Sequence, residues 1–207
     1  MSTLAYDDLG SGDPVLFVAG TAGAGRTWHI HQVPAFIAAG YRCITFDNRG
    51  IGATEDASAF STAQMVTDTA ELIDTVIGGP VRLVAMSMGA FIAQELMLSH
   101  PHLVTQAVLM GTRGRVDDTR KAFRAADLDL ANSGIELPPA YAAKVRVLEN
   151  FSPKTINDAQ LIGEWFEMFT AFPLKRTPGW RAQLSVVPTQ NRLPAYRSIV
   201  TEVLVIG

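Results

Sequence analysis

Apolar and polar positions along the chain follow two periods, and each period predicts one kind of element. Short, mostly apolar runs lie at 15–18, 41–46, 81–86 and 107–110, as is typical of strands buried on both faces of a parallel sheet. An alternating stretch at 3–8 predicts one more strand. Stretches with helical spacing separate the apolar runs, so the order of elements predicts an α/β fold with a doubly wound, mostly parallel sheet.

Three helices are predicted between these strands. The first carries Trp28, Val33, Phe36 and Ile37 on its apolar positions. The second begins after Ser61, where Ser61-Thr62-Ala63-Gln64 has the spacing of a capping box, and ends at Gly78-Gly79-Pro80. The third follows the strand at 81–86 and runs to about residue 99.

From residue 113 to about 197 the strand-like runs vanish. Helical spacing predicts an inserted helical module, and the alternating pattern returns at 201–206. The expected division is a core over 1–112, a helical cap over 113–197 and a core strand within 198–207. Helices are expected at 117–132, 139–150, 157–171 and 178–186.

Composition and charge narrow the class of protein. The chain has 207 residues, 48% of them hydrophobic and 18% charged, with a net charge of −3, which suits a soluble globular domain. Neither nucleic acid nor a membrane is expected as a partner. The N-terminal residues do not read as a secretory signal and no apolar run is long enough to span a membrane, so a cytoplasmic protein is expected. Cys43, the single cysteine, lies in an apolar run and is expected in the core.

Ser87 is the candidate for chemistry. It lies where the apolar run at 81–86 ends and helical spacing begins, in the pattern Ala85-x-Ser87-x-Gly89. A sharp strand-to-helix turn needs small neighbours and holds a serine hydroxyl above the helix N-terminus, where negative charge is stabilised. A serine that only caps the helix is the alternative reading.

Two further motifs come before this serine in the chain. A glycine-rich loop at 19–25 follows the first apolar run, but it lacks the lysine and the spacing of a nucleotide-binding loop, so it is not expected to bind a nucleotide. No cofactor and no metal are expected. An Asp47-x-Arg49-Gly50-x-Gly52 turn follows the second apolar run and is expected to position neighbouring loops. Together with the serine turn and the helical insertion, these motifs resemble the α/β-hydrolase family over the whole chain.

The resemblance implies an enzyme that cleaves an ester, thioester or lactone through an acyl-enzyme on Ser87. It also implies an oxyanion hole made by the backbone N–H groups of Thr21 and Met88. A cap over the site predicts an apolar small-molecule substrate, contacted by Trp28, Trp165, Phe166 and Phe169. The aromatic residues could instead simply pack together, and one fold serves many reactions, so haloperoxidase-like, carbon–carbon hydrolase and lyase activities stay open.

The resemblance fails at the general base. In the family the acid and the histidine follow the serine in that order, beyond the strand that matches 203–206, and neither position is within these 207 residues. The four histidines are His29, His31, His100 and His102, and none is assigned as the base. A second polypeptide could supply the pair, the segment could be missing from the recorded sequence, or the protein could be a truncated ligand-binding relative without activity.

Overall fold

The computed structural model describes residues 4–54, 56, 58–186 and 190–207, which divide into two compact units. One unit joins residues 1–125 to 177–207 and contains the sheet, and the other is the helical segment Ala126–Arg176. The compact helical unit is thus narrower than the predicted cap at 113–197, because the residues at both ends of that range group with the sheet.

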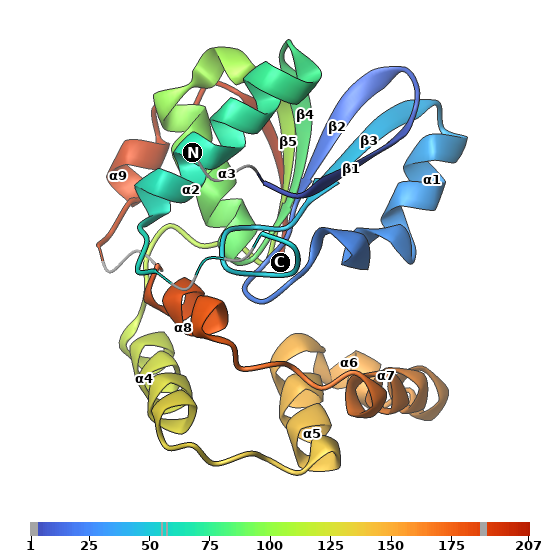
Figure 1. The fold of residues 1–207 in the computed structure, drawn as a ribbon, viewed down its shortest axis with the longest axis vertical. Helices are drawn as coiled ribbons and strands as arrows, with labels where there is room; N and C mark the ends of the chain where they lie inside the picture. The colour runs from blue at the N-terminus through green and yellow to red at the C-terminus, as the bar shows by residue number, and fades with distance from the viewer. Residues whose placement is uncertain (1–3, 55, 57, 187–189) are drawn as a thin grey trace. The chain divides into compact units, whose positions relative to one another are not determined.

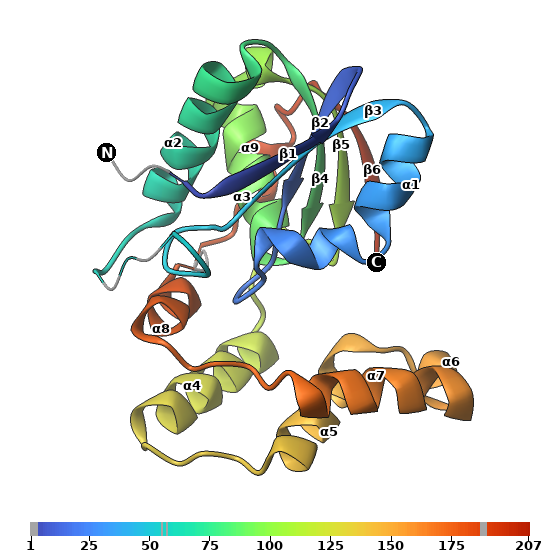
Figure 2. The ribbon, with the colours of Figure 1, turned by 45° about the vertical axis from the view of Figure 1, so that its right-hand side comes forward.

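The sheet confirms the predicted fold class (Figures 1 and 2). Its spatial order is β1-β3-β2-β4-β5-β6, with β1 antiparallel to β3 and every other neighbouring pair parallel. The strands are β1 (Tyr6–Gly10), β2 (Asp13–Val18), β3 (Tyr41–Phe46), β4 (Val81–Met86), β5 (Val104–Met110) and β6 (Glu202–Ile206).

Helices cover both faces of this sheet, as a doubly wound fold requires. On one face, α2 (Thr62–Leu72) and α3 (Met88–Ser99) pack on a core that includes Leu16, Ile44 and Leu83. On the other face lies α1 (Gln32–Ala38), preceded by a short 3₁₀ helix over Gly25–His29 (Figures 1 and 2). The side chains of a strand alternate between these two faces, so both faces of β2 and β4 are apolar.

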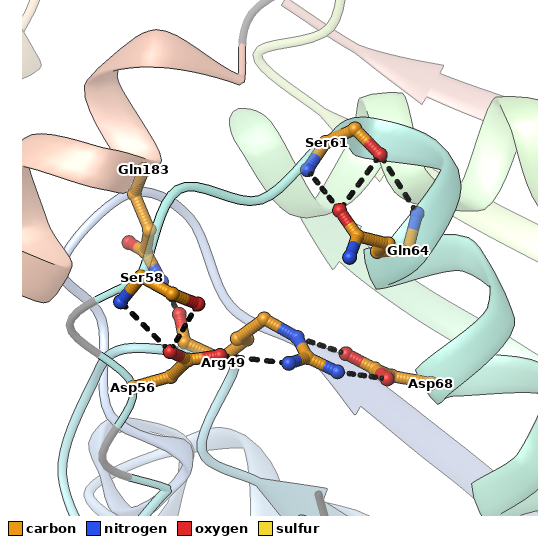
Figure 3. Close-up of polar contacts among 7 residues, drawn as sticks. All are labelled: Arg49, Asp56, Ser58, Ser61, Gln64, Asp68 and Gln183. Carbon is orange, nitrogen blue, oxygen red and sulfur yellow. Dashed lines mark hydrogen bonds and ion pairs between the residues drawn. The ribbon is translucent and has the colours of Figure 1, made fainter. Parts of the chain in front are cut away.

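Local signals in the sequence set the ends of α2. Ser61 Oγ accepts a hydrogen bond from the Gln64 backbone N–H at 3.2 Å, and Gln64 Oε1 accepts one from the Ser61 N–H at 2.8 Å. This is the predicted capping box, and Figure 3 shows both side chains. The helix continues as a π-helical segment over Ile73–Ile77 and stops at Gly78, whose φ of 76° is one that glycine adopts without strain.

The remaining helices confirm the change of period after β5. Helix α4 (Asp118–Asn132) begins in the sheet unit, whereas α5 (Pro139–Asn150), α6 (Pro153–Ile156) and α7 (Ala159–Ala171) belong to the helical unit. Helices α8 (Pro178–Ser185) and α9 (Leu193–Tyr196) belong to the sheet unit. A 3₁₀ turn over Pro101–Leu103 links α3 to β5.

Strand β6 carries apolar side chains that are exposed in the described structure. It pairs with β5 through Gln106 to Met110. Leu204 and Val205 are 59% and 60% exposed. Val203, by contrast, packs against the core on the α2 and α3 face. The strand therefore partly buries Val203 and leaves the apolar side chains that follow it exposed.

Candidate active site

Ser87 occupies the turn between β4 and α3, with a backbone conformation of φ 52° and ψ −115°. Non-glycine residues seldom adopt positive φ, and Ser87 and Ala22 are the two that do so in the described part of the chain. The backbone is held on both sides, since the Ser87 N–H donates to the Met110 carbonyl and the Ser87 carbonyl accepts from the Ala90 N–H. Such strain is typical of residues placed for chemistry.

Gly89, two residues after Ser87, lies where the backbone of another segment leaves no room for a side chain. A Cβ on Gly89 would overlap the carbonyl oxygens of Val18 and Ala19, at the end of β2. Ala85 is fully buried in the sheet. The first turn of α3 therefore packs directly on β2, with Ser87 as the N-cap residue of the helix. The hydroxyl itself has no hydrogen-bond partner among the described residues.

The glycine-rich loop after β2 lies beside this serine. A Cβ on Gly20 would lie 3.2 Å from the Ser87 Cβ and 3.3 Å from the Met86 carbonyl oxygen. Thr21 follows in the loop and is half-buried, and Met88, the residue after the nucleophile candidate, is buried. The structure therefore brings the Thr21 loop and the Ser87 turn together.

Three side chains hold the glycine-rich loop at its start, middle and end. Asn48 Nδ2 donates to the Ala19 carbonyl at 3.1 Å, and Asp47 Oδ1 accepts from the Gly25 N–H at 2.7 Å. In the middle, the Ala22 N–H donates to Gln183 Oε1 at 2.8 Å. Asp47 and Asn48 both come from the turn after β3, so this turn positions a loop, as its sequence predicted.

The turn after β3 is fixed in its own right by an ion-pair network (Figure 3). The Arg49 guanidinium donates two hydrogen bonds to Asp68 of α2, at 2.8 and 2.7 Å, and a third to Asp56 at 2.7 Å. Asp56 also accepts from the Ser58 hydroxyl and backbone N–H, and these bonds, with Arg49, lower the pKa of Asp56 to about 2. The network therefore ties the turn to α2.

Trp28, expected to contact substrate, lies in the core. Its side chain is 4% exposed and its ring centroid lies 5.5 Å from that of Phe17, on the α1 face of the sheet. Its indole N–H is buried and has no hydrogen-bond partner in the part of the chain that the structure describes. The Trp28 ring packs in the core of the sheet unit, so the structure does not support a substrate contact by Trp28.

The other three aromatic candidates belong to the helical unit, on α7. The rings of Trp165 and Phe169 have their centroids 5.6 Å apart and both contact Phe151, while the Arg146 guanidinium lies 3.7 Å from the Phe169 ring centroid. Phe169 is buried in the small core of this unit, and Trp165 packs against that core. Phe166 is 37% exposed, which makes it the most accessible of the three.

His29, in the 3₁₀ helix before α1, has partners of its own on β3 and β1. Its Nε2 lies 2.9 Å from Thr45 Oγ1 and 3.6 Å from an Asp7 carboxylate oxygen. Thr45 lies on β3, two strands away from β4 in the sheet. Ser87 lies three residues beyond the β4 position that is level with Thr45, so the usual strand spacings separate Thr45 from Ser87 by about 14 Å. His29 is therefore not placed to take a proton from Ser87.

The other three histidines lie further from the serine or on the surface. His100 is the C-cap of α3, the helix whose N-cap is Ser87, and His102 follows it. Twelve helical residues at about 1.5 Å each separate the two ends of α3 by roughly 18 Å. His31 is exposed at the start of α1. The described structure thus places no histidine of the chain beside Ser87.

Two cavities in the sheet unit lie away from the serine. One, of about 560 Å³, is at the opposite end of the strands, lined by residues such as Asp13 and Arg82. The second, of about 800 Å³, is lined by α2, the C-terminal part of α3 and Arg192. Among the described residues, no group of three His, Cys, Asp or Glu side chains is arranged to hold a metal ion. None of the described helices combines the length and the apolar composition that a membrane span requires.

Two residues near the site were not predicted from the sequence. Asn48 lies in the turn after β3, and in the sequence it looks like an ordinary turn asparagine. Its side chain is buried in the structure. Gln183 lies in a helix far along the chain, and no local pattern distinguishes it from a surface glutamine. Only the fold brings it to the glycine-rich loop.

Comparison with known proteins agrees with this geometry. Residues 15–207 match the family described as Alpha/beta hydrolase family. A Mycobacterium tuberculosis protein named "Putative non-heme bromoperoxidase BpoC" is 62% identical over all 207 residues, which cover 79% of its length. Its crystal structure superposes with a TM-score of 0.94, covering 99% of this chain and 76% of that one.

More distant proteins share the fold or part of the sequence. An Azorhizobium caulinodans protein named "Putative carbamate hydrolase RutD" is 29% identical over 84% of this chain and 65% of its own length. An esterase structure from Thermogutta terrifontis, 22% identical, has a TM-score of 0.78 over 98% of this chain and 73% of that one. The family match, the BpoC similarity and the turn at Ser87 agree: the chain belongs to the α/β-hydrolase family.

Proposed function

We propose that the protein is a serine hydrolase that cleaves an apolar ester, thioester or lactone through an acyl-enzyme on Ser87. The observation that carries this proposal is the backbone of Ser87, whose positive φ holds the hydroxyl at the N-terminus of α3. Attack by the hydroxyl oxygen on a carbonyl carbon forms a tetrahedral oxyanion, which needs hydrogen-bond donors.

The donors proposed for that oxyanion are the backbone N–H groups of Thr21 and Met88. Met88 is the first residue of α3, so its N–H is free of helical hydrogen bonds. The loop carrying Thr21 is in contact distance of Ser87 through Gly20. Each such donor contributes about 3–4 kcal/mol of transition-state stabilisation.

A serine hydroxyl needs a general base, and the base proposed here lies outside these 207 residues. The positions of the four histidines support this, because none is beside Ser87. The exposed apolar side chains Leu204 and Val205 on β6 support the presence of further polypeptide against that strand. A second chain or an additional C-terminal segment would then bring both the histidine and its acid.

Intact-mass analysis of the natural protein under denaturing conditions tests the origin of the base. The proposal predicts polypeptide beyond the 22.3 kDa of these residues, either on the same chain or as a second fragment, that contains a histidine and an acid. An active protein of 22.3 kDa alone would contradict it.

The hydrolysis proposal is tested with p-nitrophenyl esters of increasing acyl length. Wild-type protein should hydrolyse them, with KM falling as the acyl chain lengthens, and Ser87→Ala should lower kcat by at least about 10⁴-fold. An unchanged rate in the variant would contradict the nucleophile assignment. Absence of both turnover and covalent labelling would favour the alternative of a ligand-binding relative without activity.

The named similarity to a bromoperoxidase supports a second candidate activity at the same serine. Hydrogen peroxide can replace water in attacking an acyl-enzyme, which releases Ser87 and a peracid. The peracid then transfers one oxygen to bromide and a proton, giving hypobromous acid and the carboxylic acid. Bromination of a dye should therefore require peroxide, a carboxylic acid and Ser87, and should be lost in Ser87→Ala.

A further inference from the structure

Gln183 of α8 is fully buried and joins two segments of the sheet unit that are far apart in the sequence. Its Oε1 accepts from the Ala22 N–H at 2.8 Å, and its Nε2 donates to the Arg49 carbonyl oxygen at 3.0 Å. The two partners fix the orientation of the amide, because a backbone N–H can only donate and a carbonyl oxygen can only accept. Both ends of the side chain are therefore used.

The residue that Gln183 holds is strained. Ala22 has a φ of 62°, and the left-handed region is disfavoured for a non-glycine residue. The Ala22 N–H lies in the peptide plane that joins Thr21 to Ala22, so a hydrogen bond to this N–H orients the plane that directly follows Thr21. A hydrogen bond to the Ala22 N–H offsets the strain and fixes the loop in one conformation.

The helix that carries Gln183 is itself firmly seated on the turn after β3. Gly179 lies against Gly50 so closely that a Cβ on either residue would overlap the backbone of the other. Figure 3 shows Gln183 beside the Arg49 turn, whose guanidinium is held by Asp56 and Asp68. Gln183 thus connects the glycine-rich loop to the Arg49 turn by one hydrogen bond to each.

From this geometry we propose that Gln183 is a positioning residue for the oxyanion hole. It does not touch the reacting atoms. It holds Ala22, and through Ala22 it aims the Thr21 N–H at the oxyanion. The inference rests on the proposed function of Ser87, and it adds a contact from a helix that follows the helical unit in the chain. A donor misplaced by about 1 Å can slow a reaction by about a hundredfold.

The test compares variants of the natural protein, isolated with any polypeptide bound to it. Gln183→Met keeps a similar volume and removes both hydrogen bonds. It should slow the labelling of Ser87 by a fluorophosphonate about tenfold to a hundredfold, and should lower kcat for esters with little change in KM. Amide hydrogen exchange at Ala22 should become faster, while exchange in the core strands stays slow.

Thr62→Val is the matched control. Thr62 Oγ1 donates to the Val186 carbonyl at 2.6 Å, so this variant removes a different hydrogen bond that anchors the end of α8. It should label at the wild-type rate. If Gln183→Met does not fold, Gln183→Asn serves instead, because its shorter amide cannot reach both Ala22 and Arg49, and its labelling should also be slowed.

The outcomes separate this inference from the proposed function. Labelling of the Gln183 variant at the wild-type rate, or equal slowing in Thr62→Val, would overturn the positioning role and leave the serine hydrolase intact. Slow exchange at Ala22 in a variant without the Gln183 amide would also overturn it. Failure of the wild-type protein to label would instead remove the nucleophile, and the positioning role with it.

Discussion

Gly89 lies directly against the carbonyl oxygen of Val18, with no space for a side chain between α3 and the end of β2. This contact sets the distance between the helix and the neighbouring strand. Since Ser87 is the N-cap of that helix, the same contact determines where the hydroxyl lies relative to the glycine-rich loop. The glycine that follows the serine is therefore a packing requirement of the site.

Gly89→Ala should be destabilising and nearly inactive. Its Cβ would overlap backbone atoms that cannot rotate away, so the helix must shift, and the free energy of unfolding should fall by about 1–3 kcal/mol. Urea unfolding and ester hydrolysis measure the two effects. Ala85→Gly, which makes a small residue smaller and introduces no overlap, is the control: it should retain most activity and lose about 1 kcal/mol of stability.

Asp47→Ala should affect stability more than chemistry. The Asp47 carboxylate accepts from the Gly25 N–H at 2.7 Å and the Ala53 N–H at 2.9 Å, so the substitution leaves two backbone donors without an acceptor. A loss of about 2 kcal/mol in the free energy of unfolding is expected, with a reduced but measurable kcat. Complete loss of activity in a stably folded variant would show instead that Asp47 takes part in the reaction.

Asp56 should make stability depend on acid pH. Hydrogen bonds from Ser58 and Arg49 lower the pKa of Asp56 to about 2 in the folded protein, below about 3.9 in an unfolded chain. The lowered pKa means that the carboxylate stabilises the fold above pH 4 and loses this effect as the pH falls toward 2. Asp56→Asn should therefore unfold more easily than wild type at pH 7, with the difference shrinking between pH 4 and pH 2. A constant difference across that range would contradict the assignment.

The aromatic residues of α7 should separate into packing and contact roles. Trp165→Ala and Phe169→Ala remove rings from the small core of the helical unit and should destabilise it by about 3–5 kcal/mol. Phe166→Ala removes an exposed ring and should leave stability nearly unchanged. If Phe166 contacts the acyl chain, this variant should raise KM for long apolar esters only. An unchanged KM would show that Phe166 does not contact the acyl chain.

The fold was predictable because its signals are local. Buried strands such as β3 and β4 appear in the sequence as apolar runs with the bounds that the structure gives, and the start of α2 follows from the Ser61 capping box. Cys43, expected in the core, is fully buried there. The helices predicted at 139–150 and 157–171 match α5 and α7 closely, because proline residues mark the ends of the helical stretches in that region.

The site was only partly predictable, since much of it depends on contacts across the sheet. Ser87 and the Thr21 loop follow from motifs beside strand ends. The hydrogen bond between Ala22 and Gln183 joins residues 161 positions apart, and no sequence period encodes it. The structure does not support the expected substrate contact of Trp28. An aromatic residue near a loop looks the same in the sequence whether it faces the core or a ligand.

The most direct test of the central claim is covalent labelling of the natural protein by a fluorophosphonate, with the modified peptide identified by mass spectrometry. The account predicts one phosphonyl group per chain, located on Ser87, and none in Ser87→Ala. Labelling at another residue, or no labelling of folded protein that retains ester hydrolysis, would contradict the assignment of Ser87 as the nucleophile.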